Sequence, residues 1–67
     1  MTIKSAVTGK SYDDSKVVFF YNLIQCMKYM KHGALPLDIL VSKDKLIFVF
    51  DKKDHQRLKE GWINGTL

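Results

Sequence analysis

The strongest constraint on this chain of 67 residues is a run of five apolar residues, Leu46-Ile47-Phe48-Val49-Phe50. A short apolar run rich in β-branched and aromatic residues is typical of a strand that is buried on both faces. Such a strand belongs at the centre of a sheet, where both faces must be covered. A chain of this size, however, buries only about 60% of the surface that its unfolded form exposes. The sequence therefore predicts more apolar sheet surface than the chain can readily cover.

The flanking segments predict the rest of a small sheet. Residues Lys16 to Tyr21 combine β-branched and aromatic side chains, which favours a strand. Leu37, Ile39 and Val41 fall on one side of the next segment and Asp38 on the other, as in a half-buried strand, although Leu40 blurs the alternation. The turn residues 42–45 join this strand to the apolar run, so the two are predicted to form a hairpin.

A first helix is predicted between the first strand and the hairpin. Asn22 and Gln25 have the spacing of a capping box at its start, and Gly33 supplies a left-handed stop at its end. Three apolar residues recur at helical spacing and are predicted to face the core: Leu23, Met27 and Met30. The alternative for this part of the chain is one long helix from Asp14 to His32.

A second, polar helix follows the hairpin. Asp51 is predicted to cap its start, and Gly61 is predicted to end it just after Glu60. The predicted fold class is therefore α+β, with a small three-stranded sheet and two helices in the order β-α-β-β-α over residues 16–67. Residues 1–15 form a leader, with a short strand predicted around Ile3 to Val7.

The surplus apolar surface predicts an interaction site. Two helices can cover one face of the predicted sheet, and the other face is then covered either by residues 1–15 or by a second copy of the chain. We therefore expect a protein partner, or a homodimer formed through a sheet face. The residues assigned to this protein-binding surface are Val18, Phe20, Ile47 and Val49, with Tyr29 of the first helix as an aromatic anchor.

Basic residues suggest a second interpretation. The formal net charge is +4, from eleven Lys and Arg against seven Asp and Glu, which is compatible with an acidic partner or with a phosphate backbone. A nucleic-acid-binding accessory protein would use the basic residues of the second helix: Lys52, Lys53, Arg57 and Lys59. Acidic residues are interspersed among them, so an ordinary solvated helix face is the simpler reading.

No pattern in the sequence predicts catalysis or a cofactor. Gly9-Lys10-Ser11 is similar to the end of a phosphate-binding loop, but Lys4 stands where that motif needs a glycine. Asp51, Asp54 and His55 gather at a helix start, where capping and a surface pair between Asp51 and His55 explain them. The sequence therefore predicts a protein that is not an enzyme.

The cysteine and histidine content bears on metals and on compartment. Cys26 is the only cysteine and His32 and His55 are the only histidines, which predicts no metal finger and no disulfide within the chain. Cys26 is predicted to be a small buried apolar residue. Without a secretion signal or an apolar run of membrane length, a free thiol indicates a reducing cytoplasm and no membrane segment.

From Lys16 onward, about three quarters of the chain resembles a family of small phage and prophage domains of unknown function. The motifs that carry the resemblance are His32-Gly33 at the helix end, Phe48-Val49-Phe50-Asp51 at the strand end, and Trp62-Ile63-Asn64-Gly65 near the C-terminus. The family has no assigned activity, so the resemblance implies no site residues. It implies a phage or mobile-element origin. Together with the surplus apolar sheet surface, this origin leads us to expect a protein-binding module that inhibits a host defence protein, as anti-CRISPR proteins do.

Overall fold

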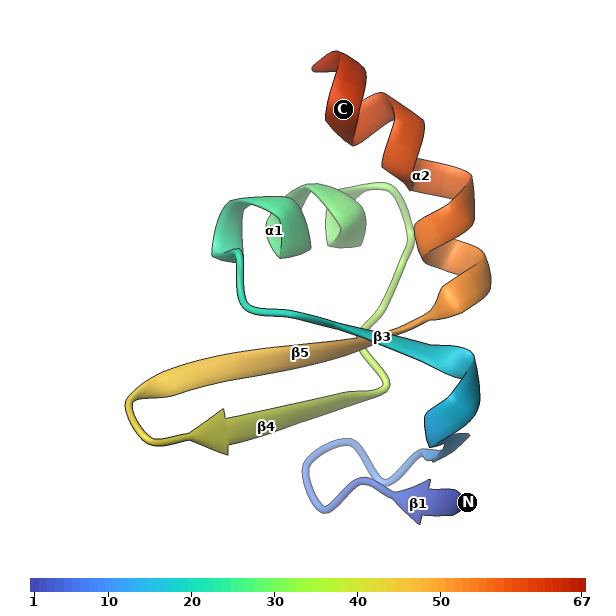
Figure 1. Ribbon diagram of the computed structural model, residues 1–67, viewed down its shortest axis with the longest axis vertical. Helices are drawn as coiled ribbons and strands as arrows, with labels where there is room; N and C mark the ends of the chain where they lie inside the picture. Colours follow the sequence, from blue (N-terminus) through green and yellow to red (C-terminus); the bar gives the residue numbers. More distant parts are fainter.

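The computed structural model describes residues 1–67 and contains an N-terminal hairpin, a three-stranded sheet and two α-helices (Figure 1). In chain order the elements are β1 (Thr2–Lys4), β2 (Ser11–Asp13), the short 3-10 helix η1 (Asp14–Lys16), β3 (Val17–Phe20), α1 (Leu23–Lys31), β4 (Asp38–Ser42), β5 (Lys45–Asp51) and α2 (Lys52–Asn64). From β3 onward this is the predicted α+β order. Because β3 is a strand, the alternative of one long helix is wrong.

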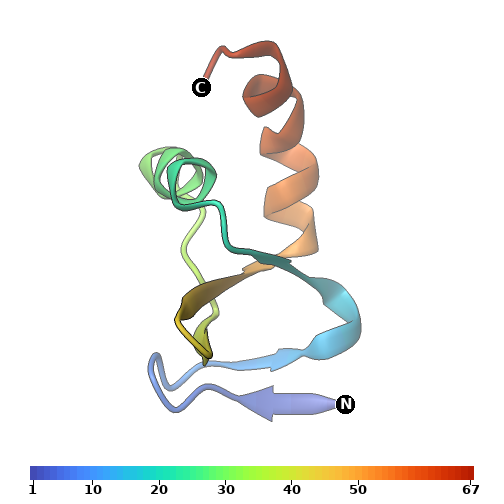
Figure 2. The ribbon, with the colours of Figure 1, turned by 60° about the vertical axis from the view of Figure 1, so that its left-hand side comes forward.

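Strand β5 lies at the centre of the three-stranded sheet and pairs antiparallel with both β3 and β4. This position confirms the prediction made from its unbroken apolar run. The two outer strands are therefore parallel to each other, and α1 forms the connection between them. Figure 2 shows both helices on one side of this sheet and the N-terminal hairpin on the other.

The helix side of the sheet forms the main core. Residues that pair across antiparallel strands have side chains on the same face, so the register determines which residues share a side. Five sheet residues pack in this core: Val18, Phe20, Ile39, Phe48 and Phe50. Cys26 and Tyr29 of α1 and Leu58 of α2 cover them. Two short helices are thus sufficient to close most of this side.

The N-terminal hairpin covers part of the opposite side. Tyr12 of β2 packs against Val17 and Val49 in a second, smaller cluster. The predicted strand at Ile3 to Val7 is shorter than expected, because the hydroxyl oxygen of Ser5 accepts from the amides of residues 7 and 8 and turns the chain there. Of the two alternatives for this side, residues 1–15 and not a second copy cover the sheet area around Val17 and Val49.

A buried carboxylate fastens this hairpin to β4. Asp38 is 4% exposed and accepts hydrogen bonds from Ser5 Oγ at 2.6 Å and from the Tyr12 hydroxyl at 2.7 Å. Its Oδ1 also accepts from the amide of Ile39 at 2.8 Å. The Ser5 and Tyr12 hydrogen bonds hold the pKa of Asp38 below its usual value, and the Asp38 carboxylate raises the pKa of Tyr12 to about 12.

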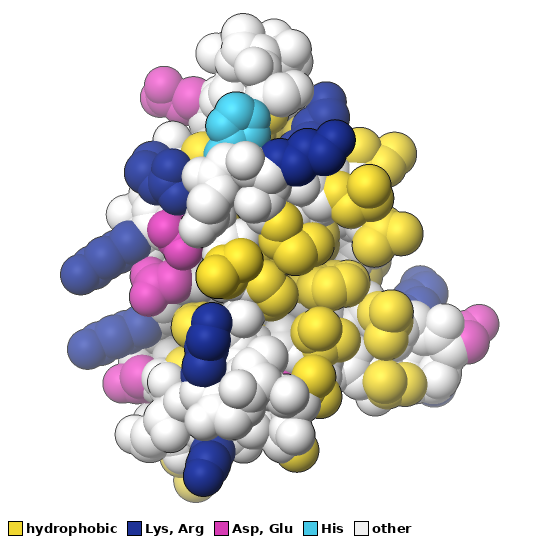
Figure 3. Space-filling view, turned by 180° about the vertical axis from the view of Figure 1, so that it is seen from behind, with side chains coloured by type: hydrophobic (Ala, Val, Ile, Leu, Met, Phe, Trp, Pro, Cys, Tyr) yellow, Lys and Arg dark blue, Asp and Glu magenta, His cyan; other side chains and the backbone are white.

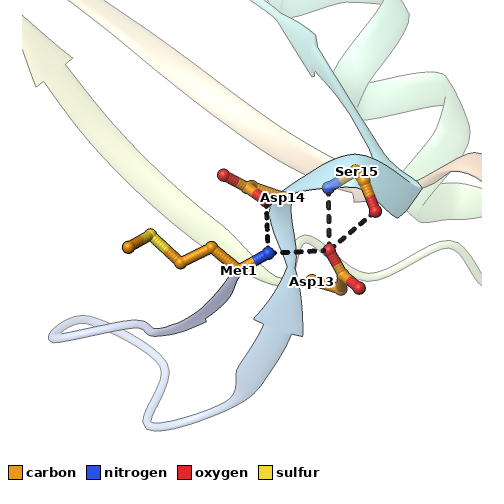
Figure 4. A network of polar contacts seen from close by, with 4 residues as sticks. All are labelled: Met1, Asp13, Asp14 and Ser15. Carbon is orange, nitrogen blue, oxygen red and sulfur yellow. Dashed lines mark hydrogen bonds and ion pairs between the residues drawn. The ribbon is translucent and has the colours of Figure 1, made fainter.

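The ends of the hairpin are joined by exposed charges (Figure 4). The Met1 amine lies 3.1 Å from Asp14 Oδ1 and 3.5 Å from Asp13 Oδ1. Asp13 Oδ1 also accepts from the amide of Ser15 at 3.0 Å and from its hydroxyl at 2.7 Å, which lowers the pKa of Asp13 to about 2. Solvent-exposed pairs of this kind contribute little to stability. The buried contacts of Asp38 therefore hold the hairpin in place.

Helix α1 begins as predicted but without a complete capping box. Asn22 Oδ1 accepts from the amides of Ile24 and Gln25 at 3.1 and 3.2 Å. Gln25 does not reach back to residue 22. Its Nε2 donates to the Tyr29 hydroxyl at 3.2 Å, one turn further along the helix. The side chain is buried, and this contact gives its amide a partner inside the core.

Helix α2 is longer than predicted, because Gly61 does not end it. The helix continues to Asn64, and Gly65 ends it with a φ of 72°. Gly61 serves a different purpose: a Cβ there would lie 3.0 Å from Leu67 Cδ2. The C-terminal residues fold back over it, and the Thr66 amide donates to the Gly61 carbonyl at 2.8 Å.

Candidate protein-binding surface

The four sheet residues assigned to a binding surface do not share one surface. Val18 and Phe20 lie on the helix side and are half-buried in the main core. Ile47 and Val49 alternate with Phe48 and Phe50 along β5, and their side chains therefore lie on the opposite face of the sheet, toward the N-terminal hairpin. Val49 is fully buried there. The prediction grouped these residues by alternation within each strand, and the register between the strands separates them.

Tyr29 is not an exposed anchor, because its side chain is fully buried. Its hydroxyl lies 2.9 Å from His55 Nδ1, so it connects α1 to α2 inside the core. The ring packs edge-on against Phe20 and Phe50. The predicted surface pair between Asp51 and His55 is therefore wrong, since His55 faces inward and burial lowers its pKa.

The thiol of Cys26 is fully buried, as predicted for a small apolar core residue. Burial raises its pKa, which favours the unreactive thiol over the thiolate. No three His, Cys, Asp or Glu side chains come together in a group that could hold a metal ion. No helix in the structure combines the length and apolarity that crossing a bilayer requires.

The apolar surface that does remain open begins on α1. The buried residues of this helix are Gln25, Cys26 and Tyr29. Leu23 and Met27, which were predicted to face the core, lie on an open side and are 55% and 47% exposed. The prediction failed because most positions of this helix are apolar, and spacing alone does not say which side packs inward.

The β4–β5 hairpin continues this open surface. Val41 pairs with Leu46, and the alternation of each strand places both side chains on the helix side of the sheet. They are nevertheless 73% and 50% exposed. A groove of about 370 Å³ lies between the start of α1 and the hairpin, and it is lined by Tyr21, Leu23, Asp44, Lys45, Leu46 and Phe48. Lys45 Nζ lies 5.6 Å from the centre of the Tyr21 ring. This pair brings an aromatic ring and a cation together beside the groove.

We call the exposed side chains on this surface the α1–hairpin face: Tyr21, Leu23, Met27, Val41 and Leu46. Figure 3 shows hydrophobic side chains gathered over this side of the molecule and toward the hairpin. Together the five form an exposed apolar surface that extends from the start of α1 to the β4–β5 hairpin. Only 12 of the 67 residues are buried, and the accessible surface is 4763 Å² against roughly 4,400 Å² for a monomer of this mass. The chain thus leaves apolar surface uncovered, as its composition predicts, but at residues that the sequence did not indicate.

The four basic residues of α2 do not form one surface. Lys53 and Arg57 are four positions apart and share one side of the helix, and Lys52 and Lys59 share another. The Arg57 guanidinium lies 3.4 Å from Asp54 Oδ1 and from the His32 carbonyl. Lys52 and Lys53 line a polar hollow of about 350 Å³ together with Lys16, which was not among the basic residues predicted for this function.

Comparisons with protein families, with curated proteins and with solved structures find no match for this chain. The resemblance to small phage domains therefore stays a prediction.

Proposed function

We propose that this chain is a non-enzymatic protein-binding module that docks another protein on its α1–hairpin face. The observation that supports the proposal is the exposure of Leu23, Met27, Val41 and Leu46 in one apolar area next to a groove. A folded protein that leaves such an area open to water commonly uses it for association. The groove beside Tyr21 and Leu46 offers a pocket for an apolar anchor, with Asp44 and Lys45 at its rim.

Replacing two residues of this face is expected to remove binding without unfolding the chain. In a Leu23→Ser, Met27→Ser variant, affinity for a captured partner should fall at least about 30-fold, the effect of losing a binding hot spot. Fluorescence of a dye that binds exposed apolar surface should fall as well, and this measurement needs no partner. The affinity is measured by titration with the protein that the tagged chain captures from its host.

Ile63→Ser is the matched control, because Ile63 is apolar and 75% exposed but lies on α2, away from this face. We expect this variant to keep the wild-type affinity. Equal losses in both variants would show that binding depends on general surface apolarity, and unchanged affinity in the α1 variant would refute the proposed face.

The finer proposal is that the partner is a host defence protein, bound in the reducing cytoplasm of a host cell. Its support is the resemblance of the chain to small phage domains, together with a free thiol, which is typical of proteins in a reducing compartment. The test is an assay of the captured host protein with and without the chain. Inhibition that disappears in the Leu23→Ser, Met27→Ser variant is the expected result.

Nucleic-acid binding is the second candidate function, favoured by the hollow in which Lys16, Lys52 and Lys53 come together without any apolar residue and with one carboxylate, that of Asp51. If this hollow holds phosphate, binding to duplex DNA should be strongest at low salt. Replacing Lys53 by Gln should then reduce the slope of log affinity against log salt by about 0.9, the value for one phosphate contact. Lys59→Gln is the control, because Lys59 lies outside the hollow. Absence of binding even at low salt would eliminate this function.

A further inference from the structure

Strand β4 is an end strand of its sheet, and half of its outer edge is unpaired. It pairs with β5 on one side and with no strand on the other. At its beginning the outer edge is occupied, because Thr8 Oγ1 donates to the Leu37 carbonyl at 2.7 Å and the Ile39 amide donates to Asp38 Oδ1 at 2.8 Å. Beyond that point no side chain or loop donates to or accepts from the backbone of residues 40–42. The open edge therefore extends from the Ile39 carbonyl through Val41.

This open edge lacks the features that usually keep strand edges apart. Proteins protect such edges with lysines, prolines, bulges or a covering segment. Ile39, Leu40 and Val41 are uncharged, and the one charged side chain of the strand, Asp38, is buried. Only the shortness of the strand limits its pairing. Both faces beside the edge are also apolar, with Val41 on the helix side and Leu40, 36% exposed, on the other.

We propose that a second copy of this chain adds to the edge of β4, antiparallel, about a two-fold axis at Leu40. The Ile39 amide is turned away from β5 toward Asp38, so the backbone groups of Ile39 and, by alternation, of Val41 point outward. Pairing about Leu40 places Ile39 opposite Val41 of the second copy. Each Val41 amide then donates to the Ile39 carbonyl across the axis, and the symmetry makes this contact twice.

The apolar sequence of the strand selects this register. With the axis at Leu40, every side chain near it meets an apolar one: Ile39 meets Val41 on the helix side, and Leu40 meets its own copy on the other. With the axis one residue later, at Val41, Lys43 would lie opposite Ile39 and Ser42 opposite Leu40. A second copy is therefore an occupant whose side chains match both faces of the edge.

The joined sheet would have six strands, with the helices of both copies on the same side. Two short strands bury less than the roughly 800 Å² per copy of a standard interface, so we expect a weak dimer that depends on concentration. The proposal does not rest on the docking function above; the two share Val41, but the docking test changes only Leu23 and Met27 of α1. It adds that two α1–hairpin faces would lie side by side, presenting two docking surfaces to one partner.

Cysteine crosslinking tests this register directly. In an antiparallel pair, residues opposite each other without a hydrogen bond have Cα atoms about 4.5 Å apart, within the range that a disulfide spans. Leu40→Cys is therefore expected to give a disulfide-linked dimer under mild oxidation. Val41→Cys is the matched control, because two residues 41 would be about 8 Å apart, too far for a disulfide. The native Cys26 does not interfere, since it is fully buried.

A second variant tests the association without oxidation. Proline is tolerated on an edge strand where the amide faces solvent, so Val41→Pro removes the donor to the second copy and leaves the pairing with β5 in place. By sedimentation, the mean mass of the wild type should rise with concentration, and the dissociation constant of the proline variant should be at least about tenfold higher. Circular dichroism confirms that the variant is folded.

The outcomes separate this proposal from the docking function. A wild type that stays monomeric up to about 1 mM, or equal crosslinking at positions 40 and 41, would overturn the paired dimer. Either result leaves the docking function standing, because its test uses Leu23 and Met27 on α1. Conversely, crosslinking at position 40 together with unchanged partner affinity in the α1 variant supports the dimer and refutes the docking face.

Discussion

Replacing Phe50 by Ala is expected to leave the chain largely unfolded at 25 °C. The Phe50 side chain is fully buried in the main core. Its ring centroid lies 5.9 Å from the ring centroid of Tyr29 and 6.1 Å from that of Phe20. Truncating a buried phenylalanine to alanine costs about 3–5 kcal/mol in free energy of unfolding. A single core in a domain of this size supplies about the same amount in total. The variant therefore loses most of the stability that the chain has.

Thermal and urea unfolding, followed by circular dichroism, measure this effect. Because the alanine variant leaves little transition to fit, Phe50→Leu gives the measurable step, with an expected loss of about 1–1.5 kcal/mol. Ile63→Ala is the control, since Ile63 is exposed and its loss should change the free energy of unfolding by less than about 0.5 kcal/mol. A cooperative transition in Phe50→Ala close to that of the wild type would show that the main core is not where the structure places it.

The fold could be predicted because its decisive signals are local. The run from Leu46 to Phe50 reads as a central strand by itself, and the turn after Val41 fixes the hairpin. Asn22 caps α1 with the two amides that follow it. Each of these features depends on residues a few positions apart, which is the range over which a sequence pattern can be read.

The site could not be predicted because its position depends on contacts between distant residues. Tyr29 and Gln25 determine which side of α1 packs inward. The Tyr29 hydroxyl contacts His55 of α2, which lies 26 positions later in the chain. The placement of the N-terminal hairpin depends on Asp38, which meets Tyr12 across 26 residues and Ser5 across 33. Those contacts decide which apolar residues are left at the surface.

The role of Gly61 also depends on a contact that the local sequence pattern does not reveal. A glycine one turn before the end of a polar helix reads as a stop, and here it lies inside the helix because Leu67 folds back onto it. The left-handed residue that ends the helix is Gly65. A sequence pattern with two glycines four residues apart does not distinguish a stop from a site of close packing.

Replacing Asp38 by Ala is expected to release the N-terminal hairpin from the three-stranded sheet. The Asp38 carboxylate accepts hydrogen bonds from the two hydroxyls of the hairpin, Ser5 and Tyr12, and no cation lies against it. Removing it leaves buried donors without an acceptor, which costs about 2–4 kcal/mol in total. Hydrogen exchange should show the loss locally, as faster exchange of the Ser5 amide, which donates to the Lys10 carbonyl inside the hairpin.

The effect of this variant should also depend on pH. The pKa of Asp38 is lowered in the folded chain, so its stabilisation is complete above the unfolded pKa of about 3.9 and is lost as the pH falls through the folded value. The contribution of Tyr12 to stability depends on pH in the opposite direction. Its pKa is raised to about 12, so its contribution is complete below about pH 10 and is lost as the pH rises toward 12.

The difference in free energy of unfolding between the wild type and Asp38→Ala should therefore be constant between about pH 5 and 9 and should shrink on both sides. Urea unfolding at a series of pH values measures it. Asp44→Ala is the control, because Asp44 is an exposed carboxylate at the tip of the β4–β5 hairpin, and it should produce no such profile. A difference that is the same at pH 3 and pH 7 would mean that the carboxylate charge does not hold the hairpin. The apolar contacts of Tyr12 with Val17 and Val49 would then have to hold it alone.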